Sequence, residues 1–295
     1  MANSIVPLGT ASSITPRVMT ALARLRELPA SAPIVHRALV LLENPDFVIA
    51  ELKKTLLSDP AIAARVLRLA NSAYFGFRSE VQTVSQAIIL LGQHRIRTVL
   101  QRILVDKLLS DLAHGRSAAS PLRKLALATA TASCTLSQLL LREDAEEMML
   151  AGLLHNIGDL FFLSQFPAEY AHASQMAEQL GRQDAMMTIF GLAAGHAGKL
   201  LLENWHFPPL YTAVVEHVEE PFAPACPPEF ATPIALVYAG VRLARPFVTC
   251  AAVSEAIQRV PADVCEFLGL DAELLAEVYQ TMPQRMSMEQ LQAAR

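Results

Sequence analysis

Charge and glycine are both scarce in this sequence. Only 18% of the 295 residues are charged and only 12 are glycine, whereas 53% are hydrophobic. Disordered chains combine low hydrophobicity with high net charge, and loop-rich β folds use many glycines, so both classes are excluded. Leucine and alanine abound, which favours helix. The chain can therefore bury a large helical core, in one large or two medium domains.

Net charge and cysteine are also low. The net charge of −4 and the pI near 6.1 provide no electrostatic attraction to nucleic acid or anionic lipid, so we expect neither as a direct partner. The four cysteines, Cys134, Cys226, Cys250 and Cys265, lie far apart and form no Cys-x-x-Cys pair. This spacing argues against structural zinc and against a disulfide framework, and it fits a reducing cytoplasm.

Long apolar runs are missing despite a mean hydropathy of +0.32. Residues 1–17 lack a basic segment followed by an apolar core, so we expect no signal peptide. No run reaches the ~18 uninterrupted apolar residues that suggest a membrane-spanning helix. We assign the surplus hydrophobicity to helical cores and a subunit contact.

Helix start and stop signals follow one another along the whole chain. Thr15-Pro16, Asp46 and Asp59-Pro60 are typical of helix N-termini, and Thr83-x-x-Gln86 is a capping box for a helix that Gly92 closes. No period-2 stretch is long enough to predict a strand. These patterns predict an all-α fold.

A short polar segment at 114–120 predicts a boundary inside this helical chain. It separates an N-terminal helical subdomain over 14–115 from a second helical subdomain over 120–285. A proline-rich loop at 219–231 interrupts the second subdomain.

The organising stretch of the second subdomain is the apolar run MMLAGLLHNIGDLFFL, which contains His155, Asn156 and Asp159. Gly152 and Gly158 within it allow close backbone approach where a larger side chain would obstruct. A histidine and an amide inside such a run must find partners, because a buried unpaired polar group costs roughly 1–3 kcal/mol. The pair is typical both of satisfied cores and of functional sites.

Several motifs in consecutive order resemble the HDOD domain of bacterial signalling proteins over roughly residues 20–245. They are LPASAPIVHRALVLL, SDPAIAARVLRLANSAYFG and VQTVSQAIILLG in the first half, and AGLLHNIGDLFF, GHAGKLLLENWHFP and AVVEHVEEP in the second. The resemblance implies an N-terminal helical bundle packed on a C-terminal subdomain similar to the HD superfamily of metal-dependent phosphohydrolases. HDOD proteins are generally regarded as non-catalytic relatives of that superfamily.

The HD pattern implied by this resemblance provides a His, a His-Asp pair and a distant Asp as metal ligands. Here the pair reads His155-Asn156. The upstream helix LRKLALATATASCTLSQ contains no histidine, and Thr129 or Thr131 is the nearest polar group. Asn156 can form hydrogen bonds where Asp would coordinate, so it can preserve the fold of the turn.

The distant Asp of the pattern falls within VYAGVRLAR, around Gly240 or Val241, where there is no carboxylate. One of four ligands survives, and both anionic oxygens, which hold a hard dication most strongly, are missing. We therefore expect no catalytic residue and no bound metal or cofactor.

Two further histidines offer an alternative. His196 and His217 could join His155 in a neutral three-histidine site, a known zinc ligand set. HD relatives that hydrolyse cyclic dinucleotides resemble this chain in carrying extra downstream histidines. However, Val218 follows His217 and the GYP motif is missing. The other interpretation is that these are core or rim histidines bonded to backbone carbonyls.

Four polar or aromatic residues are binding or interface candidates. Asn71 and Ser72 end a helix before an aromatic turn, which is typical of a C-cap or of a contact between subdomains or with a partner. Asp159 and Trp205 complete the set.

The sequence thus predicts a non-catalytic HDOD module that acts in bacterial signal transduction by binding other signalling or regulatory proteins, or a small ligand. No further domain is recognised, so the module is expected to act by association, without direct nucleic-acid or membrane binding. The alternative is a metal-dependent phosphohydrolase or cyclic-dinucleotide phosphodiesterase with an altered ligand set. The partner, the pathway and the oligomeric state are not predicted.

Overall fold

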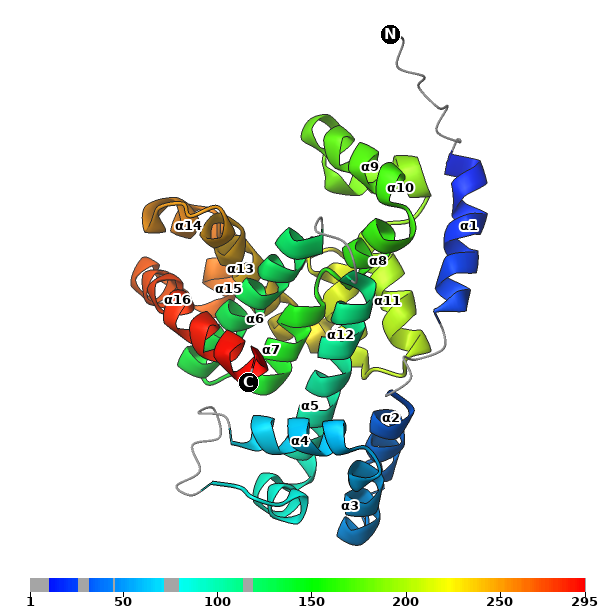
Figure 1. Ribbon diagram of the computed structural model, residues 1–295. Coiled ribbons are helices and arrows are strands. Elements are labelled where there is room, and N and C mark those ends of the chain that lie inside the picture. The colour runs from blue at the N-terminus through cyan, green and yellow to red at the C-terminus, as the bar shows by residue number, and fades with distance from the viewer. Residues whose placement is uncertain (1–10, 26–31, 45, 72–79, 114–118, 295) are drawn as a thin grey trace.

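The computed structural model describes residues 11–25, 32–44, 46–71, 80–113 and 119–294, which form helices joined by short loops (Figure 1). These ranges contain no β-strand, and the predicted all-α fold is confirmed. The helices are α1 (Ala11–Arg24), α2 (Ala32–Leu41), α3 (Ile49–Leu57), α4 (Pro60–Ala70), α5 (Val84–Ala113), α6 (Ser120–Leu140), α7 (Ala145–Leu154), α8 (Ile157–Gln165), α9 (Pro167–Leu180), α10 (Arg182–Phe190), α11 (Ala194–Asn204), α12 (Pro209–His217), the 3-10 helix η2 (Pro228–Phe230), α13 (Ala231–Val248), α14 (Val253–Gln258), α15 (Ala262–Leu268) and α16 (Ala272–Ala294).

The helices are mostly too short or too polar to span a membrane. Within the described ranges no single helix is long and apolar enough to cross a membrane. Only α10 and α11 taken together, bent by 68° at their break, meet the requirement by length and composition.

Two of the predicted helix starts are confirmed in atomic detail. The Asp59 carboxylate accepts hydrogen bonds from the backbone N–H groups of Ala61 and Ile62, at 2.8 and 3.3 Å. In the capping box, the Gln86 N–H donates to Thr83 Oγ1 (3.2 Å) and the Thr83 N–H donates to Gln86 Oε1 (3.1 Å). These bonds satisfy N–H groups that lack a partner within their own helix.

Two other helix starts differ from prediction. α1 begins at Ala11 and contains Pro16, so Thr15 is not its N-cap. The Thr15 hydroxyl instead donates to the carbonyl of Phe190 at 3.0 Å, a tertiary contact that local spacing does not encode. α3 begins at Ile49 without a side-chain cap, which leaves Asp46 in the preceding turn.

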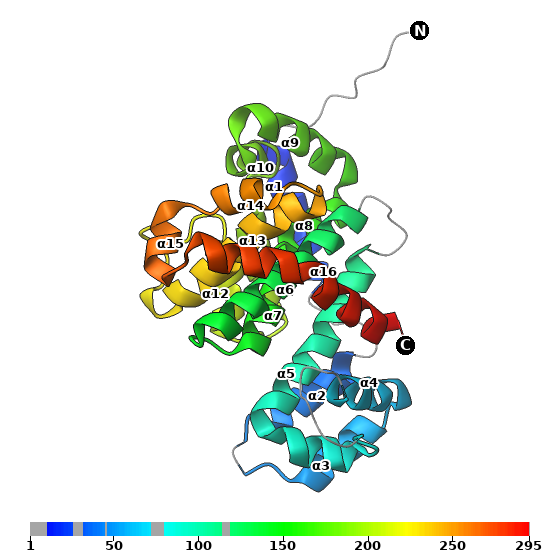
Figure 2. The ribbon, with the colours of Figure 1, turned by 90° about the vertical axis from the view of Figure 1, so that its left-hand side faces the viewer.

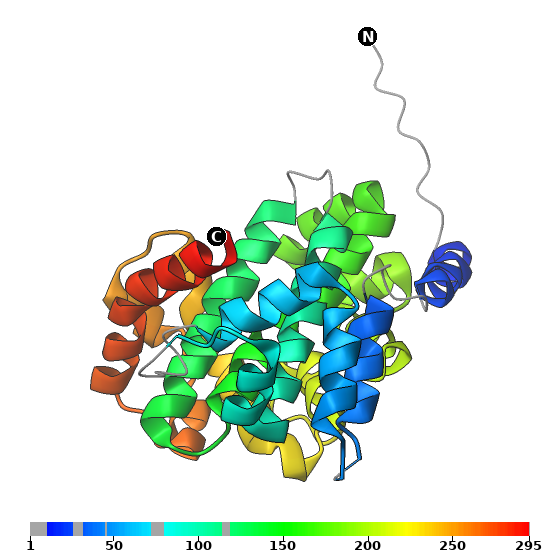
Figure 3. The ribbon, with the colours of Figure 1, turned by 60° about the horizontal axis from the view of Figure 1, so that its bottom comes forward.

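Helix α5 connects the two halves of the molecule. Helices α2, α3 and α4 pack against α5 (Figure 3). The backbone of α5 bends at Gly92, with φ 71° and ψ 177°. After the bend, Gln93 and Arg97 donate to the Leu42 carbonyl and Asp106 pairs with Arg65 of α4, while α5 also contacts α7 and α8. Gly92 therefore ends one helical segment, as predicted, but the chain continues directly into the next. The predicted boundary at 114–120 falls mostly outside the described residues.

The first helix lies against helices of the second half of the chain. α1 packs along α10 and α11 (Figure 1). Arg17 forms an ion pair with Glu169 (3.5 Å), and the indole Nε1–H of Trp205 donates to the carbonyl of Leu25 (2.8 Å). Both α1 and α5 thus contact helices that follow residue 120, so the predicted ranges 14–115 and 120–285 are packed against each other.

Helix α6 forms the centre of the second half. It packs against α7 and α13, and α16 lies across it (Figure 2). Its buried residues from 126 to 137 are mainly Ala, Thr and Ser, which let neighbouring helices approach closely. A Cβ atom on Gly152 of α7 would lie 2.6 Å from Ala130 Cα. The small residues of α6 and Gly152 therefore fix where α7 ends and where His155 stands.

Candidate functional site

His155 and Asn156 lie at the junction between α7 and α8, both buried. Gly158, in the first turn of α8, packs against the Ala194 carbonyl of α11, where a Cβ atom would overlap that oxygen. Close packing on both sides of the junction thus depends on Gly152 and Gly158, as the sequence predicted. The junction itself is held inside the core by backbone-to-backbone contact.

The His155 imidazole is bonded within its own turn. Its Nδ1 lies 2.7 Å from the carbonyl oxygen of Gly152. Because a carbonyl can only accept, Nδ1 carries the proton in this contact. Burial lowers the pKa of His155 to about 4, so the ring is neutral at physiological pH.

Asn156 uses only half of its amide. Its Nδ2 donates to the carbonyl of Leu122 in the first turn of α6 (2.9 Å), whereas the buried Oδ1 has no hydrogen-bond partner among the described residues. The buried hydroxyls of Thr129 and Ser133 on α6 are likewise without a partner there. Gly240 of α13 faces them, and a Cβ atom at Gly240 would overlap Ser133 Oγ.

The resemblance places the HD ligand positions at Thr129 or Thr131, His155, Asn156 and Gly240 or Val241, and all of these groups are neutral. A hard dication is held mainly by anionic oxygens. Within the described ranges, no group of three or more His, Cys, Asp or Glu side chains could hold a metal ion.

His196 and His217 converge on Glu216. His196 Nδ1 lies 2.9 Å from Glu216 Oε1, His217 Nε2 lies 3.5 Å from Oε2, and Lys199 Nζ lies 2.7 Å from Oε2. Burial alone would raise the pKa of Glu216, but hydrogen bonds from Lys199 and His196 lower it. The structure does not assemble these histidines with His155 into a three-histidine set.

Asp159, one of the predicted candidates, belongs to a buried polar contact. Its Oδ1 accepts a hydrogen bond from the Tyr170 hydroxyl (3.0 Å) and is paired with the Arg182 guanidinium. Arg182 also lies 3.8 Å from Glu219 Oε1, which Arg245 contacts at 2.7 Å. The sequence singled out neither arginine, because α8, α10 and α13 are distant in the chain.

Of the other interface candidates, Asn71 and Trp205 make hydrogen bonds within the chain. The Asn71 side chain donates to the carbonyls of Leu67 (2.9 Å) and Val81 (2.8 Å) and accepts from the Val81 N–H (2.7 Å). It therefore joins the end of α4 to the segment before α5. Trp205 is buried and bonded to Leu25, as described above. Ser72 lies outside the described residues.

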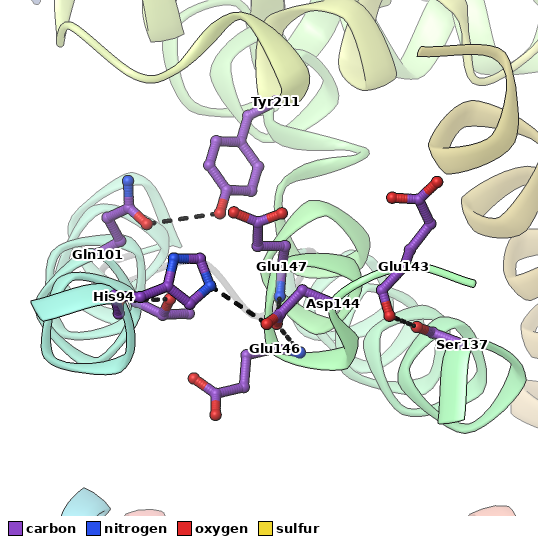
Figure 4. A network of polar contacts seen from close by, with 9 residues as sticks. His94, Gln101, Ser137, Glu143, Asp144, Glu146, Glu147 and Tyr211 are labelled. Atoms are coloured by element: carbon purple, nitrogen blue, oxygen red, sulfur yellow. Dashed lines mark hydrogen bonds and ion pairs between the residues drawn. The ribbon is translucent and has the colours of Figure 1, made fainter. Parts of the chain in front are cut away.

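A second polar cluster joins α5 to the start of α7 (Figure 4). His94 Nε2 lies 3.2 Å from Asp144 Oδ2, and Asp144 caps α7 by accepting from the N–H groups of Glu146 and Glu147. Tyr211 of α12 points into the same region, with its hydroxyl 3.4 Å from Gln101 Oε1. Asp144 thus joins α5 to α7, through His94 on one side and the backbone N–H groups of Glu146 and Glu147 on the other.

Burial, with a smaller contribution from the Asp144 charge, raises the pKa of Glu146 to about 7. The unfolded chain ionises Glu146 first as pH rises, so this group costs stability progressively between about pH 4.5 and 7. We expect Glu146→Gln to match wild type near pH 4 and to be more stable by about 3 kcal/mol near pH 8.

Urea unfolding at these two pH values measures the difference. Glu51→Gln on the exposed face of α3 is the matched control, because it makes the same chemical change at a solvent-exposed position. A stability difference that is the same at both pH values would show that Glu146 is not desolvated in the folded protein.

Solved structures share this fold at low sequence identity. A Shewanella amazonensis protein provisionally described as a phosphohydrolase has a TM-score of 0.70 and 23% identity, covering 93% of this chain and 97% of that one. An HDOD domain protein of unknown function from Geobacter sulfurreducens has a TM-score of 0.64 and 19% identity, covering 94% and 97%. A Marinobacter aquaeolei protein provisionally described as a signal transduction protein has a TM-score of 0.62 and 21% identity, and the match covers 98% of this chain and 67% of that one. The fold is thus of the all-α, HD-like class.

The family follows from the sequence. The family model of the HDOD domain matches residues 28–221, and the chain belongs to the HDOD domain family. A curated relative from Treponema pallidum, an uncharacterized protein, is 25% identical over 203 residues. That match covers 67% of this chain and 38% of the relative, so the chain spans less than half of the relative's length. The predicted resemblance is confirmed.

Proposed function

We propose that this protein is a non-catalytic regulatory module of cytoplasmic signal transduction that acts by binding other signalling or regulatory proteins. The observation that carries the proposal is the chemistry of the junction between α7 and α8. The groups at the HD ligand positions, Thr129, His155, Asn156 and Gly240, are all uncharged. A hydrolytic HD site needs a metal to activate water and polarise phosphate, and neutral groups hold a dication weakly.

Membership of the HDOD family and the similarity in fold to a protein provisionally described as a signal transduction protein support the regulatory part of the proposal. The burial of the junction supports the non-catalytic part. His155 is only 6% exposed and Asn156 only 4%, so solvent and substrate have little access to either. A catalytic metal must keep a coordination position open to water or substrate.

Hydrolysis assays test the proposal against the phosphohydrolase alternative. Purified protein is incubated with bis-(p-nitrophenyl) phosphate and with a cyclic dinucleotide, in the presence of Mg²⁺ or Mn²⁺. We expect rates equal to those of protein-free controls. Turnover that requires metal, stops with chelator and is lost in His155→Ala would contradict the non-catalytic assignment.

We expect Asn156→Asp alone to create no activity, because the first histidine and the distant carboxylate are still missing. The new carboxylate would lie buried beside the Leu122 carbonyl, so desolvation would raise its pKa. Its folded pKa would then exceed the unfolded value near 3.9, and the mutant would lose stability relative to wild type as pH rises above about 4. Unfolding midpoints from mild acid to neutral pH measure this loss; a pH-independent difference would show that position 156 is solvated.

A further inference from the structure

Arginines from two helices meet around one carboxylate beside the α7–α8 junction. Arg182 begins α10, Arg245 lies in the last turns of α13, and Glu219 follows α12. Arg245 Nη2 lies 2.7 Å from Glu219 Oε1, and Arg182 Nε lies 3.8 Å from the same oxygen. Arg182 also pairs with Asp159 of α8, which places this group beside the α7–α8 junction. We call Arg182, Glu219, Arg242 and Arg245 the arginine recess.

The recess is open to solvent although protein surrounds it. Burial alone would raise the pKa of Glu219, but Arg245 and Arg182 outweigh burial and hold the pKa below its usual value. The Glu219 side chain is nevertheless 44% exposed, and those of Arg182 and Arg245 are 39% and 38% exposed. All three side chains are therefore accessible to a ligand from solvent.

Positive charge exceeds negative charge in this recess. Arg242 is one helical turn before Arg245 on α13, its positive charge acts on Glu219, and Tyr238 faces its guanidinium, 4.6 Å from the ring centroid. Its Nη2 donates to the Tyr238 hydroxyl (2.6 Å), but its buried Nε has no partner among the described residues. The positive charges of Arg182, Arg242 and Arg245 all act on Glu219, and the carboxylates of Asp159 and Glu219 balance two of them, which leaves a net charge of +1.

The pairing of Arg182 makes the recess preorganised. The Asp159 carboxylate, which also accepts a hydrogen bond from Tyr170, pairs with Arg182 and raises the pKa of its guanidinium above the usual value. Glu219, by contrast, is anchored only through arginines and is the most exposed member of the group. An incoming anion could therefore replace Glu219 without disturbing Arg182 and Asp159.

We infer that the arginine recess binds the phosphoryl group of a small molecule, with the ligand taking the place of the Glu219 carboxylate. Guanidinium forks form paired, charge-assisted hydrogen bonds with phosphate oxygens. A phosphoryl dianion offers oxygens to both Arg182 and Arg245, the two arginines that contact Glu219, and neutralises the excess charge, which a single carboxylate such as Glu219 does not do. The inference deepens the proposed regulatory function and rests on it only for the role of the ligand.

Calorimetric titration with inorganic pyrophosphate tests the inference on the full chain, at low salt, neutral pH and with EDTA present. Chelator removes any metal-dependent contribution, so failure here is separate from failure in the hydrolysis assay. We expect wild type to bind and Arg245→Gln to bind about tenfold or more weakly, the loss typical of one charge-assisted contact. Arg259→Gln, which removes an equally charged exposed side chain in a helix-surface pair, is the control with unchanged affinity.

Glu219→Gln is expected to change the affinity for pyrophosphate in the opposite direction. Removing the competing carboxylate should tighten pyrophosphate binding several-fold, a result that loss of structure cannot produce. Parallel titrations with orthophosphate and with adenosine 5′-diphosphate distinguish free phosphate from a phosphorylated metabolite as the source. The inference is overturned if wild type and Glu219→Gln both fail to bind at millimolar pyrophosphate, or if Arg245→Gln and Arg259→Gln bind equally well while circular dichroism shows both folded.

Discussion

Alanine at position 158 is expected to destabilise the protein by about 3 kcal/mol or more, at the upper end of what overpacking a core costs. Gly158 is buried in the first turn of α8, and a Cβ atom there would overlap the Ala194 carbonyl oxygen and lie 2.8 Å from its carbon. Both atoms are backbone, so no rotamer change can relieve the overlap. α8 and α11 would have to separate.

Urea denaturation of Gly158→Ala and Gly269→Ala measures this effect with its own control. Gly269 follows α15 in the left-handed region (φ +72°), and an added Cβ atom would meet only Arg142 Nη2 at 3.8 Å, so alanine there adds only backbone strain, roughly 1–2 kcal/mol. We expect the Gly158 variant to lose clearly more. Equal losses would show that α8 and α11 are not in backbone contact.

The second large effect is expected for Leu154→Ala, at about 2–5 kcal/mol. Leu154 is fully buried at the C-terminus of α7, so truncation leaves a cavity beside the junction. The helical spacing of Ile62, Val66 and Leu69 in the sequence predicts one buried stripe, but Leu69 on α4 is only partly buried. Leu69→Ala should therefore cost less.

The two leucines form a matched pair for equilibrium unfolding, since the chemical change is the same. We expect the larger shift of the denaturant midpoint for Leu154→Ala. A Leu154→Ala midpoint within error of wild type, or a smaller shift than for Leu69→Ala, would place the core elsewhere.

Local chemistry explains which parts of the fold were predictable. The Asp59 cap and the Thr83–Gln86 box act over three residues, so spacing alone reveals them. The docking of α1 is different, because Thr15 bonds to Phe190 and Leu25 to Trp205, partners that are 175 and 180 residues apart in the sequence. Spacing in the sequence contains no signal for such contacts.

The same distinction applies to the candidate site. The His155-Asn156 junction was predictable, because a polar pair inside an apolar run is visible in the sequence. The arginine recess was not predictable. Arg182, Glu219 and Arg245 come from separate segments, and in the sequence each of them looks like an ordinary charged surface residue. Only the fold brings them to one carboxylate.

The most direct test of the central claim is the metal content of the full chain, purified without chelator and measured by inductively coupled plasma mass spectrometry. If the uncharged groups Thr129, His155, Asn156 and Gly240 cannot hold a dication, the protein carries no stoichiometric Mg, Mn, Fe or Zn. One or more equivalents per chain, lost in His155→Ala, would contradict the account and restore the phosphohydrolase alternative.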